Sequence, residues 1–308
     1  MKTYLVTGGA GFIGSHIVET LVKRGAHVRV LDNFSTGKRE NLQLLNKKIE
    51  LIEGDIRDRD IVSKAVTGVD YVLHQAALGS VPRSIENPAE TNEVNVAGTL
   101  NLLLLAQSAG VKRFVLASSS SVYGDTPTLP KHENMPLLPL SPYATSKLAA
   151  ECYALNFYHI YHLPVVCLRY FNVFGPRQDP DSQYAAVIPR FIEAFSKNNC
   201  AVVYGDGEQT RDFTYVENVV RANLSACTSE AAIGKAINIA CGTRHSLNEL
   251  LQSLQDIFKR KIEVSYMKAK LGDARDSLAA IERARDLLGY EVRVQFREGL
   301  QHTVQSTS

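Results

Sequence analysis

A glycine-rich turn between an apolar strand and a helical segment restricts the possible fold of this chain more than any other feature. Residues 2–7 form a short apolar run, and glycines follow at once in residues 8–14 with the spacing Gly-x-x-Gly-x-x-Gly. Residues 15–24 then show helical periodicity, and a second apolar run over 27–31 ends on Asp32. Strand, glycine turn, helix, strand and acid, in this order, predict the first unit of a parallel sheet that binds a dinucleotide.

The turn and the acid also predict which dinucleotide is bound. Glycines let the backbone approach a pyrophosphate, which the positive N-terminus of the following helix stabilises. Asp32 lies where a carboxylate accepts hydrogen bonds from the adenosine ribose, and its charge would repel a 2′-phosphate. We therefore predict NAD rather than NADP as the cofactor.

The alternation of strands and helices continues along the first half of the chain. We expect further strands over residues 49–53, 70–74, 114–117 and 163–169, and helices over residues 61–66, 92–109 and 142–161. In such a sheet, ligands bind at the carboxyl ends of the strands. Residues 75–77 and the serines at 118–121 occupy two of these ends, although a run of serines is also typical of a hydrogen-bonded turn.

A tyrosine and a lysine in the helix over 142–161 are candidates for acid–base chemistry. Tyr143 and Lys147 stand four residues apart, so they project from one helix face. A phenol has an unperturbed pKa near ~10, and a neighbouring ammonium favours the phenolate. The pair is typical of a general base tuned toward neutral pH, but without its context such a pair is more typical of an ordinary helix surface.

The pattern changes from about residue 175, where the expected elements become short and mixed. Helices are expected over residues 217–225 and 247–258. We therefore predict an α/β fold with two regions. Residues 1–174 form a Rossmann-type doubly wound parallel sheet that binds NAD, and residues 175–308 form a smaller mixed α/β substrate-binding region, partly intermingled with the first.

Composition narrows the classes of function. The 308 residues carry a formal net charge of +2 without a basic run, which gives no indication of nucleic-acid or membrane binding. The five cysteines are scattered, without the paired spacing of a metal site, and are typical of core residues in a reducing compartment. No signal region or membrane-spanning apolar stretch is found, so we expect a soluble cytoplasmic protein without a metal.

Four motifs together resemble one family. They are the glycine turn over 7–14, the serines before Tyr123-Gly124, Tyr143 with Lys147, and residues 211–216, Arg-Asp-Phe-Thr-Tyr-Val. From residue 2 to about residue 290 the chain resembles the extended short-chain dehydrogenases/reductases, and among them the NAD-dependent sugar-nucleotide epimerase/dehydratase family.

The resemblance implies a mechanism. Tyr143 would remove the proton from a sugar 4-hydroxyl while a hydride moves from C4 to tightly held NAD, and Ser119 would hydrogen-bond the same oxygen. Lys147 would bind the nicotinamide ribose and lower the pKa of Tyr143. Dehydratases and glucuronate decarboxylases of the family carry acids where Ser120 and Ser121 stand here. The expected outcome is return of the hydride to the other face of the keto sugar, which is 4-epimerisation.

Three further segments, over 79–84, 172–180 and 184–189, resemble bacterial UDP-N-acetylglucosamine 4-epimerases. In that group, the position matched by Ser277 is a gatekeeper, which is tyrosine where only non-acetylated sugars are accepted. A small side chain leaves room for a 2-acetamido group and does not exclude plain glucose. The resemblance thus implies interconversion of UDP-N-acetylglucosamine and UDP-N-acetylgalactosamine, with UDP-glucose and UDP-galactose as a further pair.

Two alternatives remain open. A UDP-glucuronate-type 4-epimerase would need a cationic or strongly donating group at the C6 end of the pocket, and the sequence places neither Arg83 nor Arg177 there. A catalytically silent NAD-binding regulator is the other alternative, but such a protein does not need Ser119, Tyr143 and Lys147 together.

One departure from the family pattern concerns the diphosphate. Lys270 replaces an expected arginine, and lysine offers a point charge where arginine offers a bidentate fork. Arg211 is then expected to carry more of the diphosphate contact. Arg275 would assist it, unless Arg275 is a solvated surface charge.

The candidate site residues form three sets. The catalytic set is Ser119, Tyr143 and Lys147. The cofactor-binding set is Gly8, Gly11, Phe12, Ile13, Gly14, Asp32, Asn33, Asp55, Ile56, Gln75, Ala76, Ala77, Asn95, Tyr143, Lys147 and Tyr170. The substrate-binding set is Gly79, Ser80, Ser119, Ser120, Asn172, Gln178, Ala186, Val187, Arg211, Arg275 and Ser277. The resemblance further implies a UDP-sugar substrate and a homodimer that pairs the helices over 92–109 and 142–161, and Tyr123 is expected to pack rather than to react.

Overall fold

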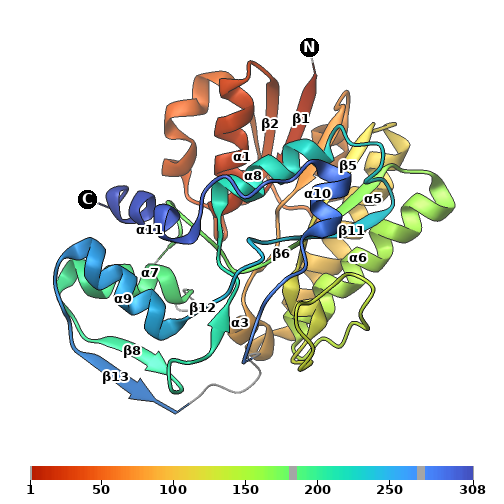
Figure 1. The fold of residues 1–308 in the computed structure, drawn as a ribbon. Helices are drawn as coiled ribbons and strands as arrows, with labels where there is room; N and C mark the ends of the chain where they lie inside the picture. The colour runs from red at the N-terminus through yellow and green to blue at the C-terminus, as the bar shows by residue number, and fades with distance from the viewer. Residues whose placement is uncertain (1, 180–185, 269–274, 308) are drawn as a thin grey trace.

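The computed structural model describes residues 2–179, 186–268 and 275–307, and its centre is a seven-stranded parallel sheet (Figure 1). The strand order is β11-β6-β5-β4-β1-β2-β3. These strands are β1 Thr3–Thr7, β2 His27–Asp32, β3 Ile49–Glu53, β4 Tyr71–His74, β5 Arg113–Ser119, β6 Val165–Tyr170 and β11 Lys235–Ile239. The order reverses between β1 and β4, as in a doubly wound sheet, and the predicted fold class is confirmed.

Helices cover both faces of the sheet because successive strand side chains point to opposite sides. Leu5 packs into an apolar cluster with α2, α5 and α6, whereas its neighbour Val6 packs into a second cluster with α1 and α8. These helices are α1 Phe12–Lys23, α2 Arg59–Val66, α5 Thr99–Ser108, α6 Pro142–Tyr161 and α8 Val216–Ala226. Burial on both faces explains why the strands read as nearly continuous apolar runs.

The helix expected over residues 92–109 is not a regular α-helix. The short helix α4 Pro88–Asn92 leads into a π-helical segment, η2 Glu93–Gly98, and only then into α5. A π-helical segment changes which side chains face the sheet. The apolar pattern of the sequence at 3.6 residues per turn does not reveal it.

The seventh strand comes from the second half of the chain. β11 pairs in parallel with β6, and α8 packs on the same sheet through its Val219 and Val220. The sequence pattern did not single out β11 as a strand. Residues beyond 174 therefore contribute to the central sheet as well as to the smaller region, and the boundary at 174 stays a prediction.

The smaller region lies beside the lower edge of the sheet in Figure 1, where α7 and α9 stand next to β8 and β13. Its elements are α7 Val187–Lys197, β8 Ala201–Tyr204, α9 Leu247–Phe258 and β13 Val264–Met267. The pairs β7 Val173–Phe174 with β10 Thr214–Tyr215, and β9 Thr210–Arg211 with β12 His245–Ser246, connect it to the sheet. The remaining elements are η1 Arg39–Lys48, α3 Val81–Glu86, η3 Ser120–Tyr123, α10 Glu282–Leu288 and α11 Phe296–Gln305.

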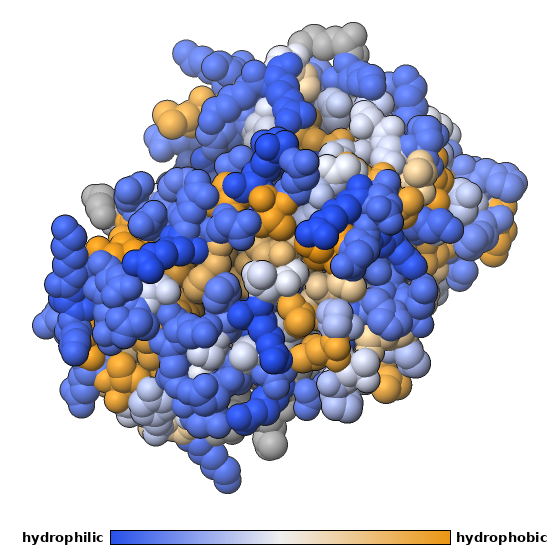
Figure 2. Space-filling model, in the orientation of Figure 1, coloured by the Kyte–Doolittle hydropathy of each residue, from blue (hydrophilic) through white to orange (hydrophobic). Residues whose placement is uncertain are grey.

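The surface is mainly polar. Charged and polar side chains cover most of the face shown in Figure 2, and apolar side chains form only small separate areas on it. Among the described helices, none is both long and apolar enough to span a bilayer.

Candidate active site

A cleft of about 1020 Å³ runs along the carboxyl ends of the central strands. This is where an open parallel sheet binds its ligands, and the volume suits a large ligand. Nearly all of the predicted site residues line it. The exceptions are Asn95, Val187 and Arg275.

The glycine turn leaves room for a pyrophosphate at one wall of the cleft. Gly8 has a φ of +67°, and a Cβ added to it would lie 2.7 Å from the backbone nitrogen of Ala76. A Cβ on Gly14 would lie 2.1 Å from the carbonyl oxygen of Gly8, so the turn and the helix pack at backbone distance. Helix α1 begins after Gly11, which has no side chain to cap the first-turn N–H groups. These donors fit the phosphates of a dinucleotide.

Two carboxylates stand at the next part of the cleft. Asp32 accepts hydrogen bonds from the backbone N–H groups of Ala10 and Phe34, both at 2.8 Å, with one carboxylate oxygen for each. Each oxygen keeps a lone pair, so Asp32 can still accept from a ribose hydroxyl. Burial raises the pKa of Asp32.

Asp55 is held differently from Asp32. The Arg57 side chain donates to both of its oxygens, at 2.9 and 2.8 Å, and Asn33 Nδ2 donates at 2.8 Å. These donors, Arg57 above all, lower the pKa of Asp55 to about 2. Asp55 is therefore a firmly ionised acceptor at this end of the cleft. Glycine turn and acids together fit an adenine dinucleotide.

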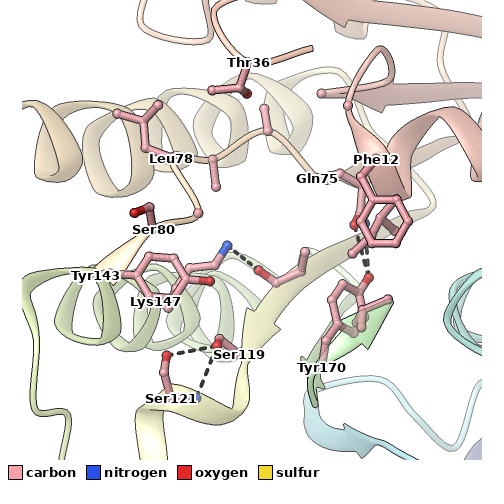
Figure 3. Close-up of a pocket in the computed structure, with 18 of the residues that line it drawn as sticks. Phe12, Thr36, Gln75, Leu78, Ser80, Ser119, Ser121, Tyr143, Lys147 and Tyr170 are labelled. Atoms are coloured by element: carbon pink, nitrogen blue, oxygen red, sulfur yellow. Dashed lines mark hydrogen bonds between the residues drawn. The ribbon is translucent and has the colours of Figure 1, made fainter. Parts of the chain in front are cut away.

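Tyr143, Lys147 and Ser119 meet in the middle of the cleft (Figure 3). Helix α6 starts here because Ser141 Oγ accepts the N–H of Ala144 at 3.2 Å and Pro142 occupies the first turn. Lys147 Nζ donates to the carbonyl oxygen of Ala117 at 2.7 Å, and burial lowers the pKa of Lys147 to about 8.

The pKa of Tyr143 differs from the expectation. Burial raises it, and the interaction with the Ser119 side chain acts in the opposite direction but does not outweigh burial. The ammonium of Lys147 does not outweigh burial either, so the expected lowering of the Tyr143 pKa is not reached. A phenolate at Tyr143 thus requires further positive charge in the cleft.

Ser119 is oriented by its own turn. It caps η3, and its Oγ accepts hydrogen bonds from the N–H of Ser121 at 3.2 Å and from Ser121 Oγ at 2.9 Å (Figure 3). A hydroxyl has two acceptor lone pairs and one proton, so the proton of Ser119 is left to donate into the cleft.

The far end of the cleft combines a small side chain with amides. Asn172 Nδ2 donates to the carbonyl oxygen of Asp212 at 3.2 Å and to Ser277 Oγ at 3.3 Å. Gln178 Nε2 donates to the carbonyl oxygen of Val173 at 3.1 Å. Among the described residues, Gln178 Oε1 is one of the buried side-chain oxygens without a hydrogen-bond partner.

Three predicted residues stand outside the cleft lining. Asn95 is buried behind it, where Oδ1 accepts the N–H of Leu78 at 2.8 Å and Nδ2 donates to Ser146 Oγ at 3.0 Å. Asn95 therefore supports the wall of the cleft. Val187 is the first residue of α7, and only the preceding Ala186 lines the cleft.

The two arginines predicted to contact the diphosphate have different surroundings. Arg275 Nη2 pairs with Asp206 at 3.0 Å on the surface, so the alternative of a surface charge describes it. Arg211 lines the cleft, and its Nη1 donates to the carbonyl oxygens of Thr210 and Arg275 at 2.9 and 2.8 Å. Lys270 lies outside the described residues.

Lys131 is a buried cation of the cleft that no sequence pattern marked. Lys131 is 3% exposed, lines the cleft near Ser277, and donates from Nζ to Thr126. It lies in a loop without periodicity, so no local pattern marked it. Its backbone pairs with Leu278 and Ala280, contacts that only the folded chain creates.

Comparison with known proteins places these features in a family. The model of the NAD dependent epimerase/dehydratase family matches residues 4–240. A putative UDP-glucose 4-epimerase of Methanocaldococcus jannaschii is 41% identical over 306 residues, covering 97% of this chain and 96% of the relative.

Solved structures of sugar-nucleotide 4-epimerases resemble this fold over nearly its whole length. A UDP-N-acetylglucosamine 4-epimerase from Methanobrevibacter ruminantium M1, in complex with UDP-N-acetylmuramic acid, is 41% identical with a TM-score of 0.95, covering 99% of this chain and 98% of that one. A UDP-glucose 4-epimerase from Thermotoga maritima with UDP-glucose is 38% identical with a TM-score of 0.94, at the same coverage. The predicted family, enzyme class and NAD cofactor are confirmed.

Proposed function

We propose a specific activity for this chain, which belongs to the NAD-dependent epimerase/dehydratase family: it is a UDP-N-acetylglucosamine 4-epimerase, with UDP-glucose and UDP-galactose as a second substrate pair. The observation that carries the proposal is the meeting of Ser119, Tyr143 and Lys147 in the cleft beside the glycine turn. NAD, when bound, accepts the hydride from the sugar C4 and returns it.

Each of the three residues has a role that its contacts support. Tyr143 takes the proton from the 4-hydroxyl and returns it, and the hydroxyl of Ser119 donates to the same oxygen as it becomes a carbonyl. Lys147, fixed by Ala117, supplies positive charge one helical turn from Tyr143. Positive charge is needed there because burial raises the pKa of Tyr143.

The residues beside Ser119 favour epimerisation over other fates of the keto sugar. Ser120 and Ser121 carry no carboxyl group, and Ser121 Oγ already donates to Ser119. Without a second acid or base at these positions, the keto sugar can rotate in the cleft and then be reduced on its other face.

The far end of the cleft supports an N-acetylated sugar. Ser277 is small and lines the cleft beside Asn172, so it leaves room for a 2-acetamido group. The M. ruminantium enzyme, an N-acetylglucosamine epimerase by name, adds support, and the two UDP-glucose 4-epimerases support the second pair.

A UDP-glucuronate-type 4-epimerase is the second candidate. Lys131 favours it, since a buried ammonium in the cleft suits a carboxylate. Arg83 also lines the cleft, whereas Arg177 pairs with Glu19 and is not part of the lining. The silent-regulator alternative has no support, because all three catalytic positions are occupied as the chemistry requires.

We also propose a homodimer formed through α6. Tyr153, Ile160 and Tyr161 of this helix are 40%, 63% and 52% exposed, and a partner helix would cover them. Size-exclusion chromatography with light scattering should give twice the 33.9 kDa of the chain. A cytoplasmic location stays a prediction.

The test is turnover without added cofactor. The purified protein is incubated separately with UDP-N-acetylglucosamine, UDP-glucose and UDP-glucuronate, and anion-exchange chromatography resolves the C4 epimers. Conversion of UDP-N-acetylglucosamine at the highest rate is expected. Faster conversion of UDP-glucuronate would replace the proposal by the second candidate, and no conversion of any sugar, even with added NAD, would refute both.

A further inference from the structure

A buried ion pair behind the cleft, between Glu151 and Arg169, has no part in the chemistry described above. The two residues are 1% and 3% exposed. Arg169 Nη2 donates to Glu151 Oε1 at 2.6 Å, and Arg169 Nε donates to Oε2 at 3.1 Å. Because both charges lose their hydration on burial, such a pair often stabilises the fold no more than apolar residues of similar volume would. The small net stabilisation does not explain the pair, so we ask which groups it holds in place.

The pair binds both ends of the turn that carries Ser119. Ser118 Oγ donates to Glu151 Oε2 at 2.6 Å, and Arg169 Nη1 donates to the hydroxyl oxygen of Tyr123 at 2.7 Å. Ser118 directly precedes Ser119, and Tyr123 is the last residue of η3, the turn that Ser119 caps. Ser119 thus lies in a short segment that is anchored on each side to one ion pair.

The same pair anchors the helix that carries the other two catalytic candidates. Glu151 follows Lys147 by one helical turn and Tyr143 by two, so all three share one face of α6. Arg169 lies on β6 directly opposite Ser118 on β5. The contacts of Glu151 therefore fix the helix relative to both strands.

We propose that Glu151, Arg169 and Tyr123 are positioning residues that set the distance between the Ser119 and Tyr143 hydroxyls. This inference rests on the proposed function, because it assumes that these two hydroxyls act on one sugar oxygen. Burial raises the pKa of Tyr123 to about 12, so Tyr123 stays a neutral donor. A misplacement of about 1 Å in such a site can cost on the order of 10²-fold in rate.

The anchoring extends to the sugar end of the cleft. The Tyr123 hydroxyl donates to Asn238 Oδ1 at 2.7 Å, and Asn238 Nδ2 donates to the carbonyl oxygens of Lys131 and Ala280 at 2.9 and 3.3 Å. The backbone of Lys131 pairs with Leu278 and Ala280, which closely follow Ser277 in the chain. One buried network therefore connects the reacting groups with the residues around the sugar.

The first test removes one hydroxyl and uses a matched control. Tyr123→Phe takes away the oxygen that joins Arg169 to Asn238. Tyr290→Phe removes a comparable hydroxyl, which donates to the carbonyl oxygen of Ala240 at 2.8 Å and is not part of the network. We expect kcat to fall about tenfold in Tyr123→Phe with KM unchanged, and both constants to stay at wild-type values in Tyr290→Phe. Equal kcat in the two variants would overturn the proposal.

The second test removes the pair without leaving a buried charge. The double variant Glu151→Leu with Arg169→Met should fold and retain NAD, because both charges are replaced by apolar groups. Its kcat is expected to fall about 10²-fold. Wild-type kcat in the folded variant would contradict the positioning role.

A readout without turnover separates this inference from the proposed function. The Ser119 side chain lowers the pKa of Tyr143, so loss of positioning should raise that pKa. Ultraviolet titration of each protein against the same protein carrying Tyr143→Phe isolates this one tyrosine. An unchanged Tyr143 pKa in the double variant refutes the positioning role, whereas failure of the wild type to convert UDP-N-acetylglucosamine refutes only the proposed function.

Discussion

Replacing Lys147 by methionine is expected to stabilise the protein while it abolishes turnover. Lys147 is 7% exposed, and burial lowers its pKa from 10.5 to about 8. At about 1.36 kcal/mol per pKa unit, holding this ammonium charged in the folded state costs about 3 kcal/mol at pH 7. The variant also loses the hydrogen bond to Ala117, and this loss cancels about 1 kcal/mol of the stabilisation gained by removing the charge. Lys147→Met should therefore raise the free energy of unfolding by about 2 kcal/mol.

The pH dependence of this gain has a definite sign. Between pH 8 and 10.5 the unfolded chain holds the Lys147 proton and the folded protein has released it. The contribution of this group to wild-type stability therefore rises with pH across this window. The advantage of Lys147→Met should be full below pH 8 and should disappear by pH 10.5.

Urea unfolding of the NAD-free proteins at pH 7 and at pH 10 measures the effect. Lys147→Arg is the matched control, because it keeps the charge and should show no gain. The reasoning fails if Lys147→Met is no more stable than Lys147→Arg at pH 7, or if its advantage over the wild type is the same at both pH values.

Three further predictions concern the cleft. Tyr143→Phe should keep NAD and sugar-nucleotide binding but lose about 10²- to 10⁴-fold in turnover, and near-wild-type activity would overturn its role as the base. Ser277→Tyr should suppress turnover of UDP-N-acetylglucosamine selectively; equal losses for UDP-glucose would count against a gatekeeper. Gly14→Ala should be purified without NAD, because its Cβ would lie 2.1 Å from the carbonyl oxygen of Gly8, and full NAD content measured after denaturation would contradict this.

Part of the site follows from relations between close neighbours in the sequence. The glycine turn, the strand that ends on Asp32, and the single helical turn between Tyr143 and Lys147 each depend on a few adjacent residues. The structure forms these features where the sequence predicted them. The family comparisons confirm the fold and the cofactor that they implied.

Other features of the site depend on what surrounds each residue in the folded chain. The pKa of Tyr143 was expected to be lowered by Lys147, but burial raises it, and burial cannot be read from helical spacing. Asn95 stays a predicted cofactor contact, but its burial in the π-helical segment and its bond to the N–H of Leu78 could not be read from the sequence. Lys131 reaches the cleft from a loop that shows no pattern.

The sequence by itself determined the local units and the chemistry that they carry, from the first strand to the catalytic helix. Only the tertiary structure decided which distant segments meet: β11 completes the sheet, Arg275 turns to Asp206 on the surface, and Arg169 joins Glu151 behind Ser119. Periodicity and spacing report the geometry of the backbone over a few residues, whereas hydrogen bonds and ion pairs form between groups that are close in space. Separation along the chain, 115 residues between Tyr123 and Asn238, carries no information about such contacts.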